Sequence, residues 1–245
     1  MKTLIKKTYE DLSKVTAKII KEAIQEKPNL VLGLATGSTP IGTYKELIRM
    51  HREENLDFSQ VISFNLDEYL GLSADHHQSY NYFMYKNLFD YININHKNIH
   101  IPDGMTENVE EFLKEYEKKI REAGGIDLQL LGIGSDGHIG FNEPGTPLNS
   151  RTQIVKLTES TIKDNSRFFE KEEDVPRFAI TMGVQTIFEA KKTLLLASSG
   201  NKAEAVVKFI EGPITSQITA SILQKHPDTI VILDEVAASR LKRRY

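Results

Sequence analysis

Short apolar runs alternate with longer segments of helical periodicity along the whole chain, and this alternation limits the folds it can adopt. The spacing predicts strands over residues 30–35, 61–65, 98–101, 128–133, 178–181, 193–197 and 229–233. Helices are predicted over residues 9–26, 39–54, 79–89, 107–123, 202–210 and 217–223. Strands that alternate with helices are typical of a mainly parallel sheet. We therefore expect residues 1–245 to form a single α/β domain, a Rossmann-like open sheet with helices on both faces.

The composition excludes several classes of protein. The 245 residues carry a net charge of −3, which does not favour a general nucleic-acid or membrane-surface binder. There is no cysteine, so disulfides, thiolate nucleophiles and cysteine-ligated zinc are excluded. No apolar run reaches the roughly 20 residues of a membrane span. Acidic residues follow the basic start where a signal peptide needs an apolar core, so the sequence predicts a cytoplasmic protein.

The segment after the first predicted strand has the features of a phosphate-binding loop. Gly37 lets the backbone approach an anion, and Ser38 or Thr39 could cap the next helix, with Pro40 in its first turn. The free N–H groups at such a helix start attract anions. The run lacks the ending of a Walker loop and the glycine pattern of a dinucleotide site. An ordinary capped helix explains the segment equally well.

Two basic residues are further candidates for binding a phosphate. Lys202 lies near the start of a predicted helix, where the helix dipole disfavours a cation unless an anion is bound. Arg167 carries a guanidinium fork that matches phosphate geometry. For both residues, a solvated surface side chain is the simpler alternative.

An acidic pair, Asp67 and Glu68, follows the strand predicted over residues 61–65. The carboxyl ends of strands are where such sheets bind ligands. A carboxylate there could take a proton from a carbon next to a carbonyl, provided that burial raised its pKa. The alternative is an acidic pair that starts a helix, where its charge is favourable.

The most informative stretch is the glycine-rich segment 131–146. It leaves a predicted buried strand, and Asp136 and Glu143 lie on either side of His138. Either carboxylate could orient the imidazole and stabilise its protonated form, so that His138 could pass a proton in either direction. The chain has no H-E-x-x-H motif and no G-x-S-x-G elbow, so neither a metal site nor a serine hydrolase is predicted.

Taken together, these segments resemble the glucosamine-6-phosphate deaminase family. The matching stretches are residues 36–40, 64–69, 134–144, 150–152 and 200–203, in the family's order and at its spacing. The most specific of them is the Asp-Gly-His triplet followed by Phe-Asn-Glu-Pro within residues 136–144. The resemblance spans almost the whole chain.

The resemblance implies a reaction and a set of roles. Glucosamine 6-phosphate and water would become fructose 6-phosphate and ammonia, without a metal or another cofactor. His138, oriented by Asp136 and Glu143, would open the sugar ring. Asp67 would then move a proton from C2 to C1. The implied phosphate ligands are Gly37, Ser38, Thr39, Arg167 and Lys202.

Two features differ from family members that are hexamers activated by N-acetylglucosamine 6-phosphate. Those members carry basic residues shortly after the Ser-Arg-Thr motif, where this chain has Gln153 and Val155. They also have a longer tail, whereas this chain stops at Tyr245. The resemblance therefore implies hyperbolic kinetics without an activator, and a monomer or a smaller homo-oligomer.

Three other functions remain open from the sequence. A 6-phosphogluconolactonase would share the fold but needs no base at C2, and a galactosamine-6-phosphate deaminase would use the same chemistry on a different C4 hydroxyl. A sugar-phosphate sensor without catalysis usually adds a DNA-binding module, and none is found. The charged stretch 163–174, interpreted as a loop, is a candidate lid.

Overall fold

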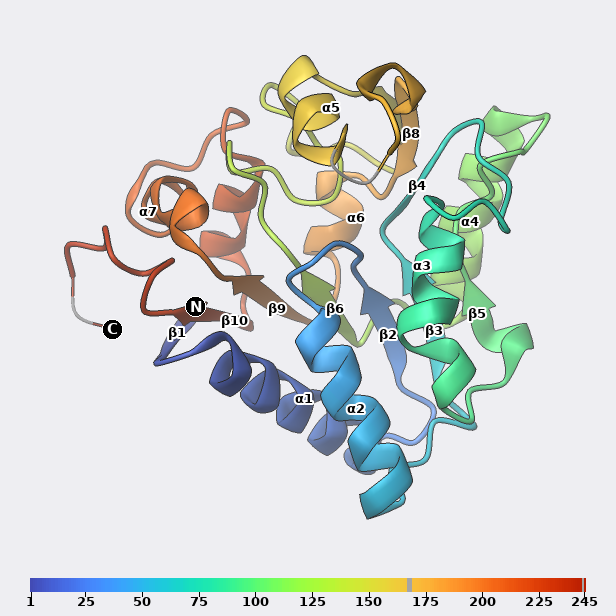
Figure 1. Ribbon diagram of the computed structural model, residues 1–245, viewed down its shortest axis with the longest axis horizontal. Helices are drawn as coiled ribbons and strands as arrows, with labels where there is room; N and C mark the ends of the chain where they lie inside the picture. Colours follow the sequence, from blue (N-terminus) through green and yellow to red (C-terminus); the bar gives the residue numbers. More distant parts are fainter. Residues whose placement is uncertain (167–168, 244) are drawn as a thin grey trace.

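A parallel sheet forms the centre of the computed structural model, which describes residues 1–166, 169–243 and 245. Seven strands in the described residues follow the order β1-β10-β9-β6-β2-β3-β5, and every neighbouring pair is parallel. They are β1 (Lys2–Lys6), β2 (Val31–Leu34), β3 (Ile62–Asn65), β5 (Ile99–His100), β6 (Leu128–Leu131), β9 (Lys192–Ala197) and β10 (Thr229–Asp234). The predicted mainly parallel sheet is confirmed (Figure 1).

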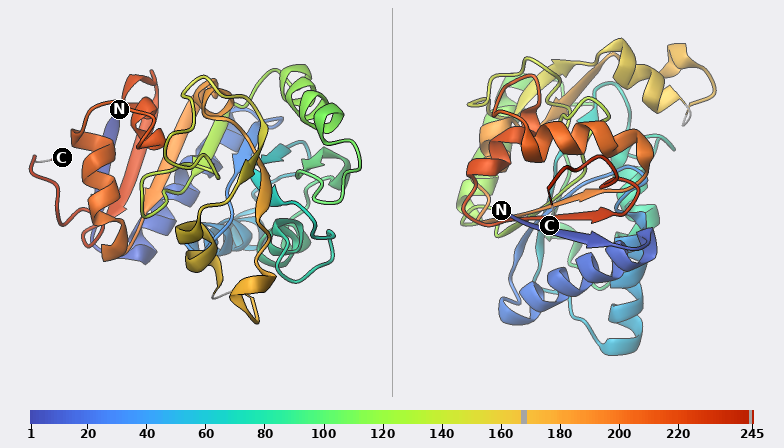
Figure 2. Two further views of the ribbon diagram at one scale, coloured as in Figure 1. Left: turned by 90° about the horizontal axis from the view of Figure 1, so that it is seen from above. Right: turned by 90° about the vertical axis from the view of Figure 1, so that its left-hand side faces the viewer.

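Helices cover both faces of this sheet, and each face has its own hydrophobic core (Figure 2). One face packs against α1 (Tyr9–Glu26), α2 (Ile41–Glu54) and α3 (Tyr80–Asn87). The other packs against α4 (Val109–Glu122), α6 (Val184–Phe188) and α7 (Ala203–Glu211). Strand β6 shows why both cores form: Leu128 and Leu130 enter the first core, while Leu131 enters the second. The expectation of helices on both faces is therefore confirmed.

A small antiparallel sheet stands beyond the carboxyl ends of the main strands, at the top of Figure 1. Its order is β4-β8-β7, with β4 (Asp67–Tyr69), β8 (Phe178–Thr181) and β7 (Gln153–Lys156). Helix α5 (Glu159–Ser166) follows β7 in the chain. The strand predicted over residues 178–181 thus exists, but it belongs to this sheet and not to the parallel one.

Several local predictions were wrong or incomplete. Asp67 and Glu68 begin a short strand and not a helix, because Asp67 pairs with Thr181 of β8. Residues 217–223 were predicted as an α-helix, whereas Thr219–Lys225 is a 3-10 helix. The pattern missed β1, β4, β7, α5 and α6. It also missed short 3-10 helices at Phe89–Tyr91, His96–Asn98, Glu172–Asp174 and Gly200–Lys202.

The strand order contains a switch point between β2 and β6. From β2 the chain proceeds to β3 and β5 on one side, and later to β6, β9 and β10 on the other. The connections after β2 and β6 therefore diverge, which leaves a crevice at the carboxyl ends of these two strands. In the part of the chain that the structure describes, no helix combines the length and apolar character needed to cross a membrane.

Candidate active site

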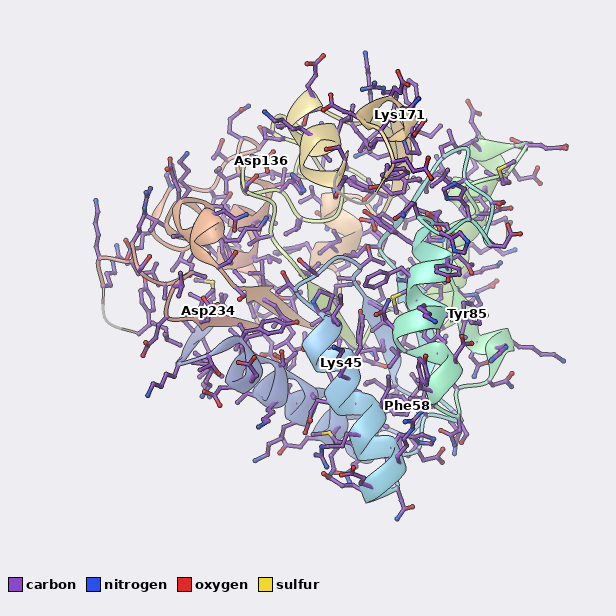
Figure 3. All side chains as sticks on the ribbon, viewed as in Figure 1. Lys45, Phe58, Tyr85, Asp136, Lys171 and Asp234 are labelled. Carbon is purple, nitrogen blue, oxygen red and sulfur yellow. The ribbon has the colours of Figure 1, made fainter. Side chains whose placement is uncertain are left out.

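A pocket lies at this switch point, and the loops after β2, β6 and β9 form much of its wall. The predicted site residues that line it are Gly37, Ser38, Thr39, Asp67, His138 and Lys202. Figure 3 shows Asp136 near the edge of the sheet where the strands end, and Phe58 near the opposite edge. Arg167, the remaining predicted phosphate ligand, lies outside the described residues. One pocket thus combines the candidate anion-binding groups with the candidate acid–base groups.

Asp67 is a buried carboxyl group at the wall of this pocket. The residue is 6% exposed, and its strand β4 pairs with Thr181 of β8. Burial, and secondarily the charge of Glu68, raise the pKa of Asp67 to about 8. Gly140 allows this close packing, since a Cβ there would lie 2.8 Å from Thr181 Oγ1 and 3.6 Å from Asp67 Oδ2. A carboxyl group with such a pKa can exchange protons near neutral pH.

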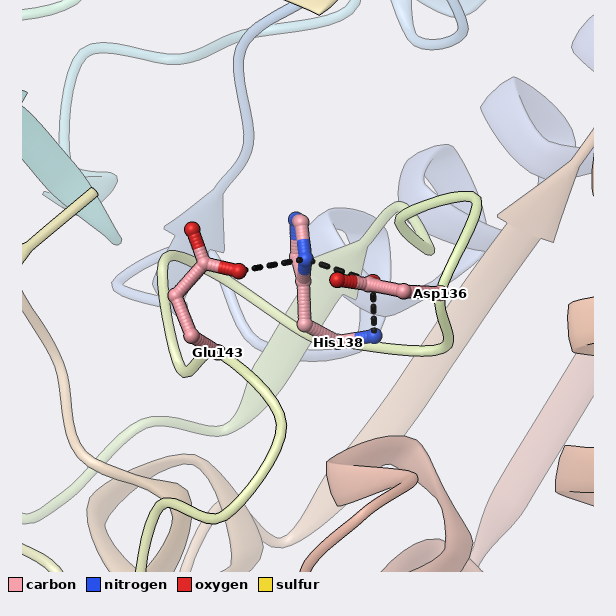
Figure 4. Close-up of side chains that lie close together, drawn as sticks. All are labelled: Asp136, His138 and Glu143. Carbon is pink, nitrogen blue, oxygen red and sulfur yellow. Dashed lines mark hydrogen bonds and ion pairs between the residues drawn. The ribbon is translucent and has the colours of Figure 1, made fainter. Parts of the chain in front are cut away.

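Two carboxylates lie close to the same ring nitrogen of His138. Its Nδ1 lies 2.7 Å from Asp136 Oδ1 and 3.6 Å from Glu143 Oε2, and the two acids approach from opposite sides (Figure 4). The backbone N–H of His138 also donates to Asp136 Oδ1 at 3.1 Å. The predicted constellation is therefore assembled, with Nδ1 as its shared atom. This leaves Nε2 as the ring nitrogen for exchanging a proton with a ligand.

Opposing effects set the acidity of Asp136. Partial burial acts to raise the pKa of the carboxyl, but the side-chain contact with His138, its charge and its backbone N–H outweigh burial and lower that pKa. Asp136 is therefore a carboxylate at neutral pH. The ligand atoms of Asp136, His138 and Glu143 lie within 4.8 Å of one another, so together they could also hold a metal ion.

The loop that carries His138 depends on glycines and on one buried amide. Gly134 leaves room for the ring, since a Cβ there would lie 2.5 Å from His138 Cε1. Its N–H donates to the His138 carbonyl at 2.8 Å, which closes a tight turn. Asn142 is fully buried and donates through Nδ2 to the carbonyls of Ile139 and Met182. This amide ties the loop to the end of β8 and fixes the position of the neighbouring Glu143.

The loop between β2 and α2 has a backbone that an anion could approach, because it contains a glycine and no side chain caps the helix that follows. Gly37 adopts a φ of +92°, which a side chain rarely allows. Helix α2 has Pro40 as its N-cap residue, and no side chain there makes a capping hydrogen bond. The expectation that Ser38 or Thr39 caps this helix was wrong, and Pro40 precedes the helix and is not in its first turn. The hydroxyls of Ser38 and Thr39 are therefore not used as caps.

The loop after β9 brings Lys202 to the pocket from the other side of the switch point. Lys202 is the N-cap residue of α7 and lines the pocket, so its predicted position near the start of a helix is confirmed. Asp234 at the end of β10 holds this loop by accepting hydrogen bonds from the Ser198 hydroxyl and the Ser199 N–H. Ser199 itself has a φ of +82°, an unfavourable conformation for a residue with a side chain. Two loops with unusual backbone geometry thus line the same pocket.

The pocket also contains residues that carried no signal in the sequence. Tyr80 at the start of α3 lines it, with its ring stacked on Phe141 at 5.8 Å between centroids. The Tyr80 hydroxyl lies 3.4 Å from that of Tyr69. Thr161 and Asn165 on α5 form another part of the wall. The predicted loop over residues 163–174 is therefore partly helical, and among the described residues of this candidate lid Asn165 lines the pocket.

Comparison with known proteins agrees with this architecture. A family model described as glucosamine-6-phosphate isomerases/6-phosphogluconolactonase matches residues 5–232. A glucosamine-6-phosphate deaminase of Thermoanaerobacter pseudethanolicus is 56% identical over 98% of this chain and 94% of its own length.

Solved structures show the same relationship. One described as a monomeric glucosamine-6-phosphate deaminase has a TM-score of 0.96 and 48% identity, covering 98% of this chain and 99% of its own. A 6-phosphogluconolactonase from Trypanosoma brucei has a TM-score of 0.79 at 21% identity, covering 98% of each chain, which shows a shared fold alone. The chain therefore belongs to the glucosamine-6-phosphate isomerase/6-phosphogluconolactonase family.

Proposed function

We propose that this chain is a glucosamine-6-phosphate deaminase, which converts glucosamine 6-phosphate and water into fructose 6-phosphate and ammonia. The observation that carries the proposal is the presence in one pocket of Asp67, with its pKa raised to about 8, and of His138, paired with two carboxylates. A lactone hydrolase needs no base for a carbon-bound proton, so Asp67 favours the deaminase over a 6-phosphogluconolactonase. The identity to a protein named for the deaminase activity supports the same choice.

The phosphate is proposed to bind at the end of the pocket formed by residues 36–39 and Lys202. Backbone N–H groups and the positive end of α2 suit a dianion, and the lysine adds a full charge. Arg167 is also proposed to bind the phosphate, because the family resemblance implies it. Anchoring the phosphate at this end would place the sugar between the His138 and Asp67 sides of the pocket.

His138 is proposed to open the sugar ring. Nε2 donates a proton to the ring oxygen as the bond from C1 to that oxygen breaks, and the hydroxyl at C1 gives its proton to a water molecule to form the aldehyde. Asp136 and Glu143 at Nδ1 stabilise the imidazolium that begins this step. General acid–base help of this kind contributes about 10²- to 10⁴-fold in rate.

Asp67 is proposed to carry out the isomerisation. Its carboxylate takes the proton from C2, and the electron pair of that C–H bond forms a C1–C2 double bond as the carbonyl π pair moves to oxygen. The oxygen takes up a proton through water while the ammonium gives one up to water, which yields an enolamine. The proton then returns to C1 to leave an iminium at C2, which water attacks with release of ammonia. The substrate ammonium beside Asp67 favours the ionised carboxylate and acidifies C2. Side chains and water supply every proton transfer in this scheme.

The test is ammonia release from glucosamine 6-phosphate by purified protein in the presence of a chelator. Galactosamine 6-phosphate and 6-phosphogluconolactone serve as parallel substrates. We expect chelator-insensitive release from the gluco substrate and no lactone hydrolysis above background. Loss of activity in chelator would instead assign a metal to Asp136, His138 and Glu143, whose ligand atoms are close enough to hold one. Lactone hydrolysis without ammonia release would overturn the proposal.

The enzyme is further proposed to show hyperbolic kinetics without an activator, as a monomer or a smaller homo-oligomer. Gln153 and Val155, at positions where activated hexamers are expected to carry basic residues, are uncharged. Gln153 donates to Asn142 Oδ1 at 3.3 Å, and Val155 packs on the small core under the antiparallel sheet. We expect a hyperbolic rate curve that N-acetylglucosamine 6-phosphate does not alter. A sigmoidal curve that this compound converts to a hyperbola would contradict the expectation.

Replacing Gly134 with alanine is expected to lower turnover by about tenfold or more and to leave phosphate binding intact. The new Cβ would lie within 2.6 Å of three ring atoms of His138 and would displace the imidazole. Gly200→Ala is the matched control, since its Cβ would meet only Val236 Cγ1 at 3.6 Å. Steady-state kinetics and calorimetric titration with inorganic phosphate measure both effects. Equal turnover in the two variants would show that the ring position is not critical.

A further inference from the structure

The phosphate loop is held from outside by a side chain that does not line the pocket. Tyr9 is the first residue of α1, and its hydroxyl reaches the opposite side of the loop between β2 and α2. The Tyr9 oxygen lies 2.9 Å from the Thr39 carbonyl and 3.2 Å from the Ser38 carbonyl, to which it donates. It also accepts a hydrogen bond from the Gly42 N–H at 2.8 Å. One hydroxyl thus connects both sides of the junction between loop and helix.

The start of α2 needs such a partner. The first N–H groups of any helix lack a partner within the helix, and a side chain at the N-cap position usually satisfies one of them. Here the N-cap residue is Pro40, which makes no side-chain hydrogen bond. The Tyr9 hydroxyl supplies the missing acceptor to Gly42 from a different helix. The cap is therefore tertiary, and it depends on a contact between α1 and α2.

The packing around this contact is specific to a glycine at position 42. A Cβ at Gly42 would lie 2.3 Å from Ser13 Oγ and 3.0 Å from Tyr9 Cε1. The absence of a side chain there lets α1 approach α2 closely enough for the phenol to reach the loop. Tyr44 adds a second anchor, since its hydroxyl donates to the Ala35 carbonyl at the start of the same loop.

These bonds control where the N–H groups of the loop point. In a planar trans peptide the carbonyl and the N–H of the next residue point in opposite directions. A Ser38 carbonyl turned toward Tyr9 therefore turns the Thr39 N–H away from Tyr9. The Thr39 carbonyl also accepts from Tyr9. The next residue is Pro40, which has no N–H, so turning this carbonyl toward Tyr9 changes the direction of no N–H group. Ser38 and Thr39 both line the pocket, whereas Tyr9 does not.

We propose that Tyr9 is a positioning residue for phosphate binding: its hydroxyl fixes the backbone of residues 38–42 so that the loop presents its N–H groups to the anion. The inference rests on the proposed function only in taking the ligand of this loop to be a phosphate ester. Tyr9 has no part in the proton transfers, since it does not line the pocket. Its loss is therefore expected to change binding and not chemistry.

The test is Tyr9→Phe, which removes one oxygen and keeps the ring between α1 and α2. We expect KM for glucosamine 6-phosphate and the dissociation constant for inorganic phosphate to rise together by about three- to tenfold, the usual worth of one hydrogen bond. The value of kcat should stay within about twofold. Tyr91→Phe is the control, because Tyr91 is 37% exposed, does not line the pocket and has Arg52 Cζ over its ring at 5.4 Å.

A double-variant cycle with Gly42→Ala separates positioning from general stability. The alanine Cβ would crowd Ser13 Oγ at 2.3 Å and Tyr9 Cε1 at 3.0 Å, and we expect this to move the phenol away from the loop. Phosphate binding in the Tyr9→Phe, Gly42→Ala pair should therefore be weakened by less than the product of the single effects. Calorimetry with inorganic phosphate measures this binding even if the protein releases no ammonia. A failure of the proposed reaction can therefore be told apart from a failure of this inference. A lower melting temperature in Tyr9→Phe with unchanged phosphate affinity and KM would overturn the inference.

Discussion

Asp67→Asn is expected to lower kcat for ammonia release by about 10²- to 10⁴-fold and to leave KM within a few-fold of the wild-type value. Asparagine has nearly the same shape but cannot accept the proton from C2. The pH profile offers a second readout, because burial and the neighbouring Glu68 raise the pKa of Asp67 to about 8. Wild-type kcat/KM should therefore rise with pH toward about 8, and the variant should lose this acid limb.

The same substitution is expected to stabilise the protein at neutral pH. The folded pKa of Asp67 lies near 8, above the ordinary value of 3.8, so the folded state keeps a proton that the unfolded state releases between these pH values. The contribution of Asp67 to the free energy of unfolding is therefore fully present below the pKa of the unfolded state. It is lost as the pH rises toward the pKa of the folded state. Asparagine does not titrate, so we expect the free energy of unfolding at pH 7–8 to increase by about 1–3 kcal/mol.

The control for both effects is Asp90→Asn, which changes an exposed acid away from the pocket and should alter neither turnover nor the pH profile. Chemical denaturation at several pH values measures the stability change. Turnover of Asp67→Asn close to that of the wild type would remove this carboxyl from the mechanism. Loss of turnover together with lower stability at neutral pH would instead indicate that the substitution disturbs the fold.

His138→Gln is the second substitution with a large expected effect, and its signature is a difference between two substrates. Glutamine can fill much of the space but cannot pass a proton between Nδ1 and Nε2. We expect turnover of the closed sugar to fall by about 10²- to 10⁴-fold. An analogue without the C4 and C5 hydroxyls can close neither a five- nor a six-membered ring, so it bypasses the opening step and should be affected much less.

Two comparisons test the assignment of this step to His138. His96→Gln, at an exposed 3-10 helix, should leave both reactions unchanged. Asp136→Asn should resemble His138→Gln in sign, because Asp136 Oδ1 lies 2.7 Å from Nδ1 and the two side chains act together in the proposed step. Equal losses on the closed and the open-chain substrates would assign His138 to a later step, or to binding, and not to ring opening.

The periodic parts of this fold could be predicted from the sequence because periodicity is local. The helix predicted over residues 9–26 is Tyr9–Glu26, and the buried strands at β2, β3, β6, β9 and β10 lie within a residue or two of their predicted bounds. The glycines and acids of residues 131–146 also marked the loop of His138, since such residues are common where a backbone must turn near a ligand. These features depend on residues close together in the chain.

The tertiary structure decided the rest, because it depends on contacts between distant segments. Strand β4 is too short to show alternation, and Asp67 acquires both its strand and its raised pKa only when β8 pairs with it and buries it. The cap of α2 was wrongly assigned to Ser38 or Thr39, because nothing near Pro40 in the chain shows that Tyr9 would reach Gly42. The sequence therefore determined which loops meet at the sheet edge, and the packing determined which groups in them are buried, charged and correctly oriented.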